Sequence, residues 1–173
     1  MGVEDVCMTK GLIRYQQCGC FHFVTFSCYQ RLPYLRTAAA RNLFERSLEV
    51  MRVRYEFFAI GYVLMPEHIH MLVNEPKKAL LSKAIQALKL SVSIQSRERP
   101  FRQPRYDDFN VHDEDKCIEK LRCMRRNPMK RGLVEKPEDW QGSNPIHDTS
   151  NAVSLGTPRA YSASGESIGS SRV

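Results

Sequence analysis

Hydrophobic and polar residues alternate at two different spacings along this chain, and these spacings predict strands and helices. Alternation at every second position, with many aromatic and β-branched residues, predicts strands. Apolar residues that recur three and four positions apart predict amphipathic helices. The predicted strands cover His22–Tyr29, Phe57–Leu64, His68–Val73 and Tyr106–Val111. The predicted helices cover Thr37–Tyr55, Leu80–Ser96 and Asp113–Arg126.

The order of these elements predicts an α+β fold. The short link between the second and third strands predicts that they are antiparallel neighbours. The whole pattern fits a ferredoxin-like antiparallel sheet with helices packed on one face. We expect this domain to cover residues 20–140, after a lead-in segment over 1–19. Ser, Gly, Asn and Thr dominate after Trp140, so 141–173 is predicted to be a disordered tail.

The 173 residues are enough for one domain with a sizeable core, and their net charge is +7. This excess favours a polyanionic partner, most often nucleic acid. No apolar run has membrane-spanning length, and the N-terminus lacks the apolar core of a signal peptide. We therefore expect a cytoplasmic location and no membrane partner. The six cysteines do not form paired units with zinc-site spacing, and we expect them to be reduced thiols.

Positive charge is concentrated between Lys120 and Lys136, where Glu135 is the only acidic residue. Such a stretch either contacts phosphate groups or forms a solvated helix face, and we favour phosphate contact. The candidate contacts are Arg122, Arg125, Arg126, Lys130 and Arg131, with Arg97, Arg99, Arg102 and Arg105 on the preceding loop.

His68 and His70 flank Ile69 in the third predicted strand, so both imidazoles project from one face of it. Two such rings can share one divalent cation, although either can also be an ordinary hydrogen-bonded histidine. Cys123 and Asn127 are four residues apart on the last predicted helix and share a face. An Asn oxygen is an acceptable ligand for Mg²⁺ or Mn²⁺.

The stretch Met65-Pro66-Glu67-His68-Ile69-His70-Met71-Leu72 resembles the His-hydrophobic-His motif of IS200-like tyrosine transposases, in particular their REP-associated branch. Further stretches resemble the same branch in order and spacing: Phe109-Asn110-Val111, Glu119-Lys120-Leu121-Arg122, Asn127-Pro128-Met129-Lys130-Arg131-Gly132-Leu133-Val134 and Glu138-Asp139-Trp140. The resemblance covers roughly Gly11 to Trp140. It implies a ferredoxin-like HUH nuclease domain that acts on single-stranded or hairpin DNA.

The resemblance also implies a mechanism in which His68, His70 and Asn127 hold one divalent metal ion, Mg²⁺ or Mn²⁺. In the family this ion polarises the scissile phosphate, and a tyrosine on the last helix attacks the phosphorus. The attack forms a 5′-phosphotyrosine and frees a 3′-hydroxyl, and another 3′-hydroxyl then rejoins the strands. Repeated extragenic palindromes are the implied targets, the basic residues of the last helix are the implied DNA contacts, and the protein is expected to be a monomer or homodimer.

This chain departs from the family at the nucleophile, because Cys123 stands where the pattern Tyr-hydrophobic-x-x-Asn-Pro has tyrosine. In the favoured interpretation the chain binds DNA as a catalytically impaired relative. In the second, another tyrosine such as Tyr106 attacks, or metal-activated water nicks the strand. In the third, Cys123 itself attacks as a thiolate, although it is shorter than tyrosine by a ring and poorly matched to phosphoryl chemistry.

Two rival classes have less support. A metal-dependent hydrolase unrelated to DNA needs a general base and a small-molecule pocket, and the sequence indicates neither. An RNA-binding protein with a ferredoxin-like sheet is disfavoured because the aromatic RNP-type signature is absent.

Overall fold

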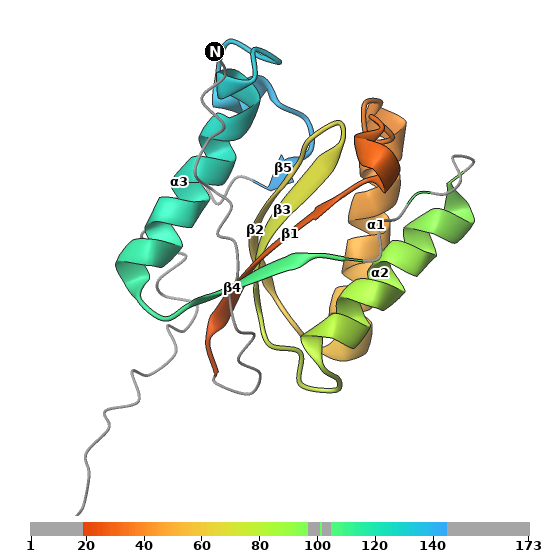
Figure 1. Cartoon of the computed structure of the whole chain (residues 1–173), viewed down its shortest axis with the longest axis vertical. Coiled ribbons are helices and arrows are strands. Elements are labelled where there is room, and N and C mark those ends of the chain that lie inside the picture. Colours follow the sequence, from red (N-terminus) through yellow and green to blue (C-terminus); the bar gives the residue numbers. More distant parts are fainter. Residues whose placement is uncertain (1–18, 97–100, 102–104, 145–173) are drawn as a thin grey trace, which may run out of the picture.

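A five-stranded antiparallel sheet with helices on both faces makes up the computed structural model, which describes residues 19–96, 101 and 105–144 (Figure 1). The strand order is β4-β1-β3-β2-β5, and each named pair is antiparallel. The strands are β1 (Phe21–Ser27), β2 (Ala59–Leu64), β3 (His68–Asn74), β4 (Asp107–Val111) and β5 (Ser143–Asn144). The helices are α1 (Ala38–Tyr55), α2 (Leu81–Gln95) and α3 (Glu114–Lys130), with short 3-10 turns η1 (Tyr29–Arg31) and η2 (Pro137–Asp139).

The two faces of the sheet carry separate hydrophobic clusters, because successive side chains of a strand point to opposite sides. On one face Val24 and Met71 pack with residues of α1 and α2, including Phe44 and Leu88. On the other face Phe23 and Leu72 pack against α3, together with Val63, Met65 and Met124. Figure 1 shows α1 and α2 on one side of the strands and α3 on the other.

Helix α3 begins at an N-cap and ends at a glycine. The side chain of Asp113 accepts a hydrogen bond from Lys116 N at 2.7 Å, which satisfies a backbone donor of the first turn. At the other end Gly132 takes a positive φ of 66°, and Leu133 N donates to Pro128 O at 3.0 Å. This is the αL glycine arrangement that commonly closes a helix.

The segment after α3 returns to the sheet. The Trp140 indole N–H donates to Leu64 O at 3.1 Å, and the Arg41 guanidinium lies 4.7 Å from the centre of the Trp140 ring. Leu64 N then donates to Gly142 O at 2.8 Å, and β5 pairs with β2. This strand lies at the start of the segment that the sequence predicts as a tail; residues 145–173, like 1–18, lie outside the described part.

The predicted α+β class, with its ferredoxin-like antiparallel sheet, is confirmed. One feature differs: α1 and α2 share a face as expected, but α3 covers the opposite face, because Leu121 and Met124 are apolar toward the second cluster. The last helix also continues four residues past Arg126, through Pro128. A proline removes one hydrogen bond of the helix, but Pro128 lies only two residues before the helix ends at Lys130.

Cys20 forms a disulfide, so the expectation of reduced thiols is wrong there, whereas Cys28, Cys117 and Cys123 form none. Among the described helices, none is both long enough and apolar enough to cross a lipid bilayer.

Candidate functional site

His68 and His70 lie on β3 with their rings on the α3 side of the sheet. Both are buried, at 6% and 5% exposure. Their ring centroids are 4.7 Å apart in an edge-to-face arrangement. The strand alternation that put them on one face in the sequence therefore brings the two imidazoles together.

Each imidazole is held through its Nδ1 atom by a different neighbour. Thr25 Oγ1 on β1 lies 2.8 Å from His70 Nδ1, and Glu67 Oε1 lies 3.1 Å from His68 Nδ1. Thr25 reaches His70 because the two residues are directly opposite in the β1–β3 register. In the described part of the chain neither Nε2 atom has a hydrogen-bond partner, so both nitrogens remain for a ligand.

The pKa values of these groups favour neutral imidazoles beside an ionised carboxylate. Burial, with the nearby charges of His68 and Lys120, lowers the pKa of His70 to about 3. Burial also lowers the pKa of His68, although the Glu67 charge opposes that shift. Burial by itself would raise the pKa of Glu67, but His68 and Arg131 outweigh it and lower the pKa. Neutral imidazole is the form that binds a metal ion.

Helix α3 runs past both histidines. Near one end of this contact, Lys120 is close enough for its charge to act on His70. Near the other end, Arg131 Nη2 lies 2.8 Å from Glu67 Oε1, beside His68. Asn127 is one turn before Arg131 and two turns after Lys120, so it lies on the stretch of helix between these two contacts.

A metal ion fits this donor set only if an oxygen ligand joins the two histidines. Within the described residues, no group of three or more His, Cys, Asp or Glu side chains could hold a metal ion. The two Nε2 atoms supply nitrogen ligands, and the Asn127 amide is the oxygen donor that the resemblance implies. Metal-binding histidines typically donate their other ring N–H to a neighbouring oxygen, as His70 can to Thr25 Oγ1 and His68 can to Glu67 Oε1.

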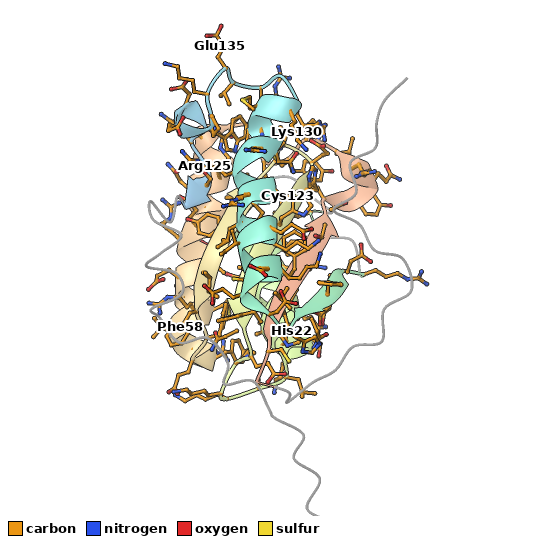
Figure 2. The ribbon with its side chains drawn as sticks, turned by 90° about the vertical axis from the view of Figure 1, so that its left-hand side faces the viewer. His22, Phe58, Cys123, Arg125, Lys130 and Glu135 are labelled. Atoms are coloured by element: carbon orange, nitrogen blue, oxygen red, sulfur yellow. The ribbon has the colours of Figure 1, made fainter. Side chains whose placement is uncertain are left out.

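The structure separates the candidate nucleophiles. Cys123 lies half-buried on α3, the helix that covers the histidines (Figure 2). Tyr106 instead belongs to the cluster on the α1–α2 face, where the Lys89 ammonium lies 5.5 Å from its ring centre. Tyr106 is therefore on the wrong side of the sheet to attack a phosphate held beside His68 and His70.

The five basic residues predicted to contact DNA are all exposed, on α3 and at its C-terminal end. Figure 2 labels two of them, Arg125 and Lys130. Two of the five form ion pairs within the chain: Arg125 with Glu138 and Arg131 with Glu67. Arg122 and Arg126 form no ion pair in the described part of the chain. Arg105 is exposed, whereas Arg97, Arg99 and Arg102 lie outside the described residues.

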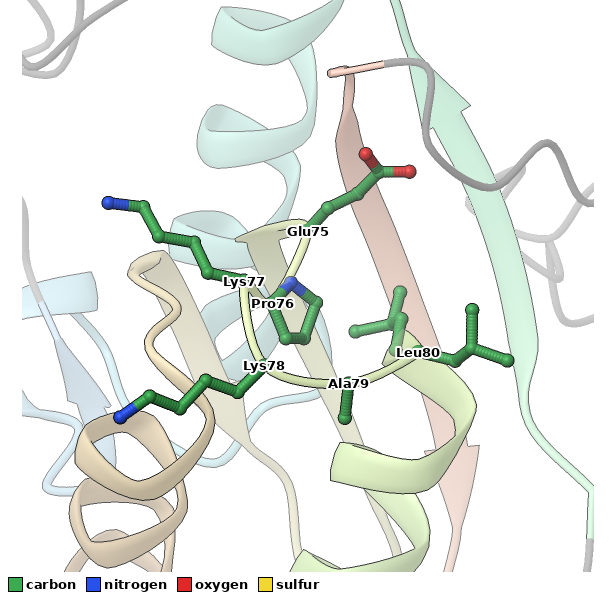
Figure 3. Close-up of a pocket in the computed structure, with 7 residues that line it drawn as sticks. Glu75, Pro76, Lys77, Lys78, Ala79 and Leu80 are labelled. Carbon is green, nitrogen blue, oxygen red and sulfur yellow. The ribbon is translucent and has the colours of Figure 1, made fainter.

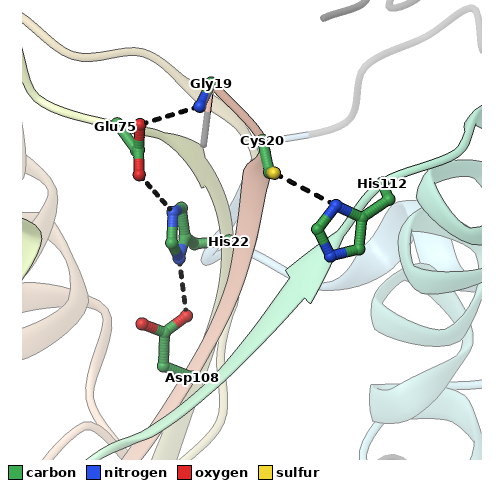
Figure 4. Close-up of polar contacts among 6 residues, drawn as sticks. All are labelled: Gly19, Cys20, His22, Glu75, Asp108 and His112. Atoms are coloured by element: carbon green, nitrogen blue, oxygen red, sulfur yellow. Dashed lines mark hydrogen bonds and ion pairs between the residues drawn. The ribbon is translucent and has the colours of Figure 1, made fainter. Parts of the chain in front are cut away.

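His22 belongs to a separate polar cluster on the α1–α2 face (Figure 4). Its Nδ1 lies 2.8 Å from Asp108 Oδ1 and its Nε2 lies 3.3 Å from Glu75 Oε1. The other Glu75 oxygen accepts a hydrogen bond from Gly19 N at 3.1 Å. The histidine is fully buried, and these contacts tie β1 to β4 and to the end of β3.

A hollow lined by residues 75–81 lies between β3 and α2 (Figure 3). It follows Asn74, at the end of β3 opposite to His68. Neither histidine of the pair lines it, so it is not part of the site.

Sequence reasoning did not assign a role in this site to Thr25, Glu67 or Lys120. Thr25 could have been found from the sequence, because it points to the same face of its strand as Phe23 and that strand must pair with another strand. Glu67 adjoins His68 in the sequence, so its carboxylate could have been proposed as a hydrogen-bond partner of the His68 ring. Lys120 precedes Asn127 by two helical turns, which places both on one helix face.

Comparisons with known proteins show which family and which solved structures the chain is similar to. A family model described as "Transposase IS200 like" matches residues 17–108, just over half of the chain. The solved structure of a REP-associated tyrosine transposase bound to a REP hairpin is 19% identical, with a TM-score of 0.72, over 95% of this chain and 99% of that one. A Deinococcus radiodurans protein assigned as a transposase is 15% identical, with a TM-score of 0.46, over 66% of this chain and 95% of that one. No curated protein matches the chain.

Proposed function

Because the chain belongs to the IS200-like transposase family, we propose that it binds single-stranded or hairpin DNA and places a backbone phosphate beside His68, His70 and Asn127. The observation that carries the proposal is the pair of buried imidazoles whose Nδ1 atoms are held by Thr25 and Glu67, which leaves both Nε2 atoms for a ligand. This is the arrangement expected of a metal-binding pair under a DNA-binding helix.

The metal ion would be held by His68, His70 and the Asn127 amide, with Mg²⁺ or Mn²⁺ as the expected ions. When bound, it would supply positive charge to the phosphate. The protein residues have positioning roles: Thr25 and Glu67 orient the rings, and Arg131 holds the Glu67 carboxylate in place. Water has little access to the two histidines, because they are only 6% and 5% exposed.

The DNA partner is supported by charge and by a relative. Arg122, Arg126 and Lys130 are exposed along α3, and salt-dependent phosphate contact is the ordinary role of such residues. The solved relative was bound to a REP hairpin. By analogy, we propose a hairpin with an adjoining single strand as the ligand of this chain.

Cys123 decides between the two versions of this function. In the family reaction a tyrosine oxygen forms a bond to phosphorus as the bond to the 3′ oxygen breaks, and that oxygen leaves as a hydroxyl. With Cys123 at this position, we propose that the chain retains DNA binding and is impaired in the covalent step. The alternative is an active strand transferase that uses the Cys123 thiolate or water.

The test compares the natural protein with Cys123→Tyr on hairpin DNA in the presence of Mn²⁺. We expect both proteins to bind the DNA, and only the tyrosine variant to form a protein–DNA adduct that survives a denaturing gel. A Cys123→Tyr/His68→Ala double variant should lose the adduct. An adduct or a nick produced by the natural protein would support the active alternative, and failure of the natural protein to bind DNA would refute the proposal.

A further inference from the structure

Lys120 is the one basic residue of α3 that the described structure buries. It is 6% exposed, whereas the five basic residues from Arg122 to Arg131 are all exposed. Its Nζ atom lies 5.0 Å from the centre of the Phe23 ring and 5.1 Å from that of the Phe109 ring. These two rings are neighbours across the β1–β4 pair, so the ammonium lies over the sheet.

The charge of Lys120 is not neutralised by a carboxylate in the described residues. Glu119, the nearest acid in sequence, instead pairs with Lys116 at 2.7 Å. Asp108 and Glu75 are engaged with His22 on the opposite face of the sheet. Contacts with aromatic faces recover only part of what an ammonium loses on leaving water. A buried ammonium without a paired carboxylate is therefore a candidate binding site for an anion.

The position of the ammonium indicates which anion. The Phe23 ring stacks on His70, with centroids 5.5 Å apart and an angle of 14° between the planes. One aromatic ring therefore links Lys120 to the histidine pair. Lys120 therefore places a positive charge near the pair that does not depend on a metal ion.

We propose that Lys120 is a phosphate-binding residue of this site, whose ammonium contacts a non-bridging oxygen of one backbone phosphate of bound DNA. The inference rests on the proposed function and adds to it a contact on the sheet side of α3, distinct from the exposed arginines. The Lys120 Nζ atom, which lies over the Phe23 and Phe109 rings, is the group that would contact the DNA phosphate. The phosphate is the missing counter-ion of the buried ammonium.

The test uses Lys120→Met in the full chain, because methionine keeps an unbranched apolar stem over the two rings and removes the charge. The matched control is Lys116→Met, one turn earlier on the same helix, where the lysine is exposed and paired with Glu119. The probe is a fluorescent hairpin oligonucleotide with a single-stranded tail, titrated by anisotropy with a chelator present and over a range of salt. Lys120→Met is expected to bind roughly fivefold more weakly at 0.1 M salt and to reduce the log–log salt slope by about 0.7.

A second measurement identifies the contact. Probes in which one phosphate at a time is replaced by an uncharged methylphosphonate are bound to the natural protein and to Lys120→Met. We expect one position where the replacement weakens the natural protein and not the variant, and a Lys120→Arg variant should keep that sensitivity. Thermal melting of each variant reports whether it has folded.

The outcomes separate the two proposals. An unchanged salt slope and an unchanged methylphosphonate profile in folded Lys120→Met would overturn the role of Lys120 and leave the proposed function standing. Equal losses in Lys120→Met and Lys116→Met would also overturn it, since a general charge effect would then account for both. No binding by the natural protein would overturn both proposals.

Discussion

Arg131, at the C-terminal end of α3, forms an ion pair with Glu67, in the turn that precedes β3, with 2.8 Å between Nη2 and Oε1. The same Glu67 oxygen lies 3.1 Å from His68 Nδ1. One carboxylate therefore connects the helix proposed to bind DNA with a histidine proposed to bind metal. DNA bound near Arg131 is therefore expected to change metal binding at His68, and a metal ion at His68 is expected to change DNA binding near Arg131.

Glu67→Gln should weaken Mn²⁺ binding without unfolding the protein. The carboxylate orients His68 and favours the tautomer with its proton on Nδ1, and loss of such a partner typically costs 10–100-fold in metal affinity. Isothermal calorimetry would measure the change, with His68→Ala as the variant that removes the ligand altogether. Equal affinity in natural protein and Glu67→Gln would mean that Glu67 does not orient this ring.

Thr25→Val should have a similar effect through His70. A metal on Nε2 requires the proton on Nδ1, which then donates to Thr25 Oγ1 across 2.8 Å. Valine keeps the shape of threonine and removes the acceptor, so we expect roughly tenfold weaker Mn²⁺ binding. Thr25→Ser retains the oxygen and is the matched control. If serine and valine weakened binding equally, packing rather than the hydrogen bond would be responsible.

The sequence predicted most of the fold because its patterns are local. Alternation along His68–Val73 and the apolar stripe of the first helix each depend on a few neighbouring residues. The start of that helix is also local, since Thr37 Oγ1 accepts a hydrogen bond from Ala40 N at 3.2 Å. The face chosen by α3 is not local. It depends on which side of the assembled sheet Leu121 and Met124 can cover.

The candidate site also combines features that depend on local sequence with features that depend on the assembled fold. His68 and His70 were predicted as a pair on one face because strand geometry places them there. The roles of Thr25 and Arg131 require knowledge of register and helix position, since their partners are 45 and 64 residues away in the chain. The alternative in which Tyr106 attacks finds no support, because this residue, just before β4, packs in the cluster on the α1–α2 face.

Gly61→Ala should destabilise the contact between α3 and the sheet. A Cβ at this position would lie 2.6 Å from Leu121 Cδ2 and 3.4 Å from Met124 Cε, so Leu121 would have to move. We expect a loss of about 1–3 kcal/mol in the free energy of unfolding, measured by chemical denaturation. Leu121→Ala removes the obstructing atoms, so the double variant should lose less than the sum of the single variants. Strictly additive losses would mean that the two residues do not clash.

His22 should make stability depend on pH above neutrality. Burial by itself would lower the pKa of His22, but its contacts with Asp108 and Glu75 outweigh burial and raise the pKa above the ordinary 6.5. The folded protein therefore keeps the His22 proton at a pH where the unfolded chain has released it. This contribution is fully present below pH 6.5 and is lost as pH rises through the raised pKa, at about 1.4 kcal/mol per pH unit within that window.

Denaturation of natural protein and His22→Gln at a series of pH values from 6 to 9 would measure this contribution. His22→Gln should be less stable than the natural protein at pH 6. Its stability should also fall less as the pH rises, because the contribution of His22 is absent. His112→Gln, which changes an exposed histidine at the end of the neighbouring strand, should keep that decline. Parallel stability curves for natural protein and His22→Gln would mean that folding does not raise the pKa of His22.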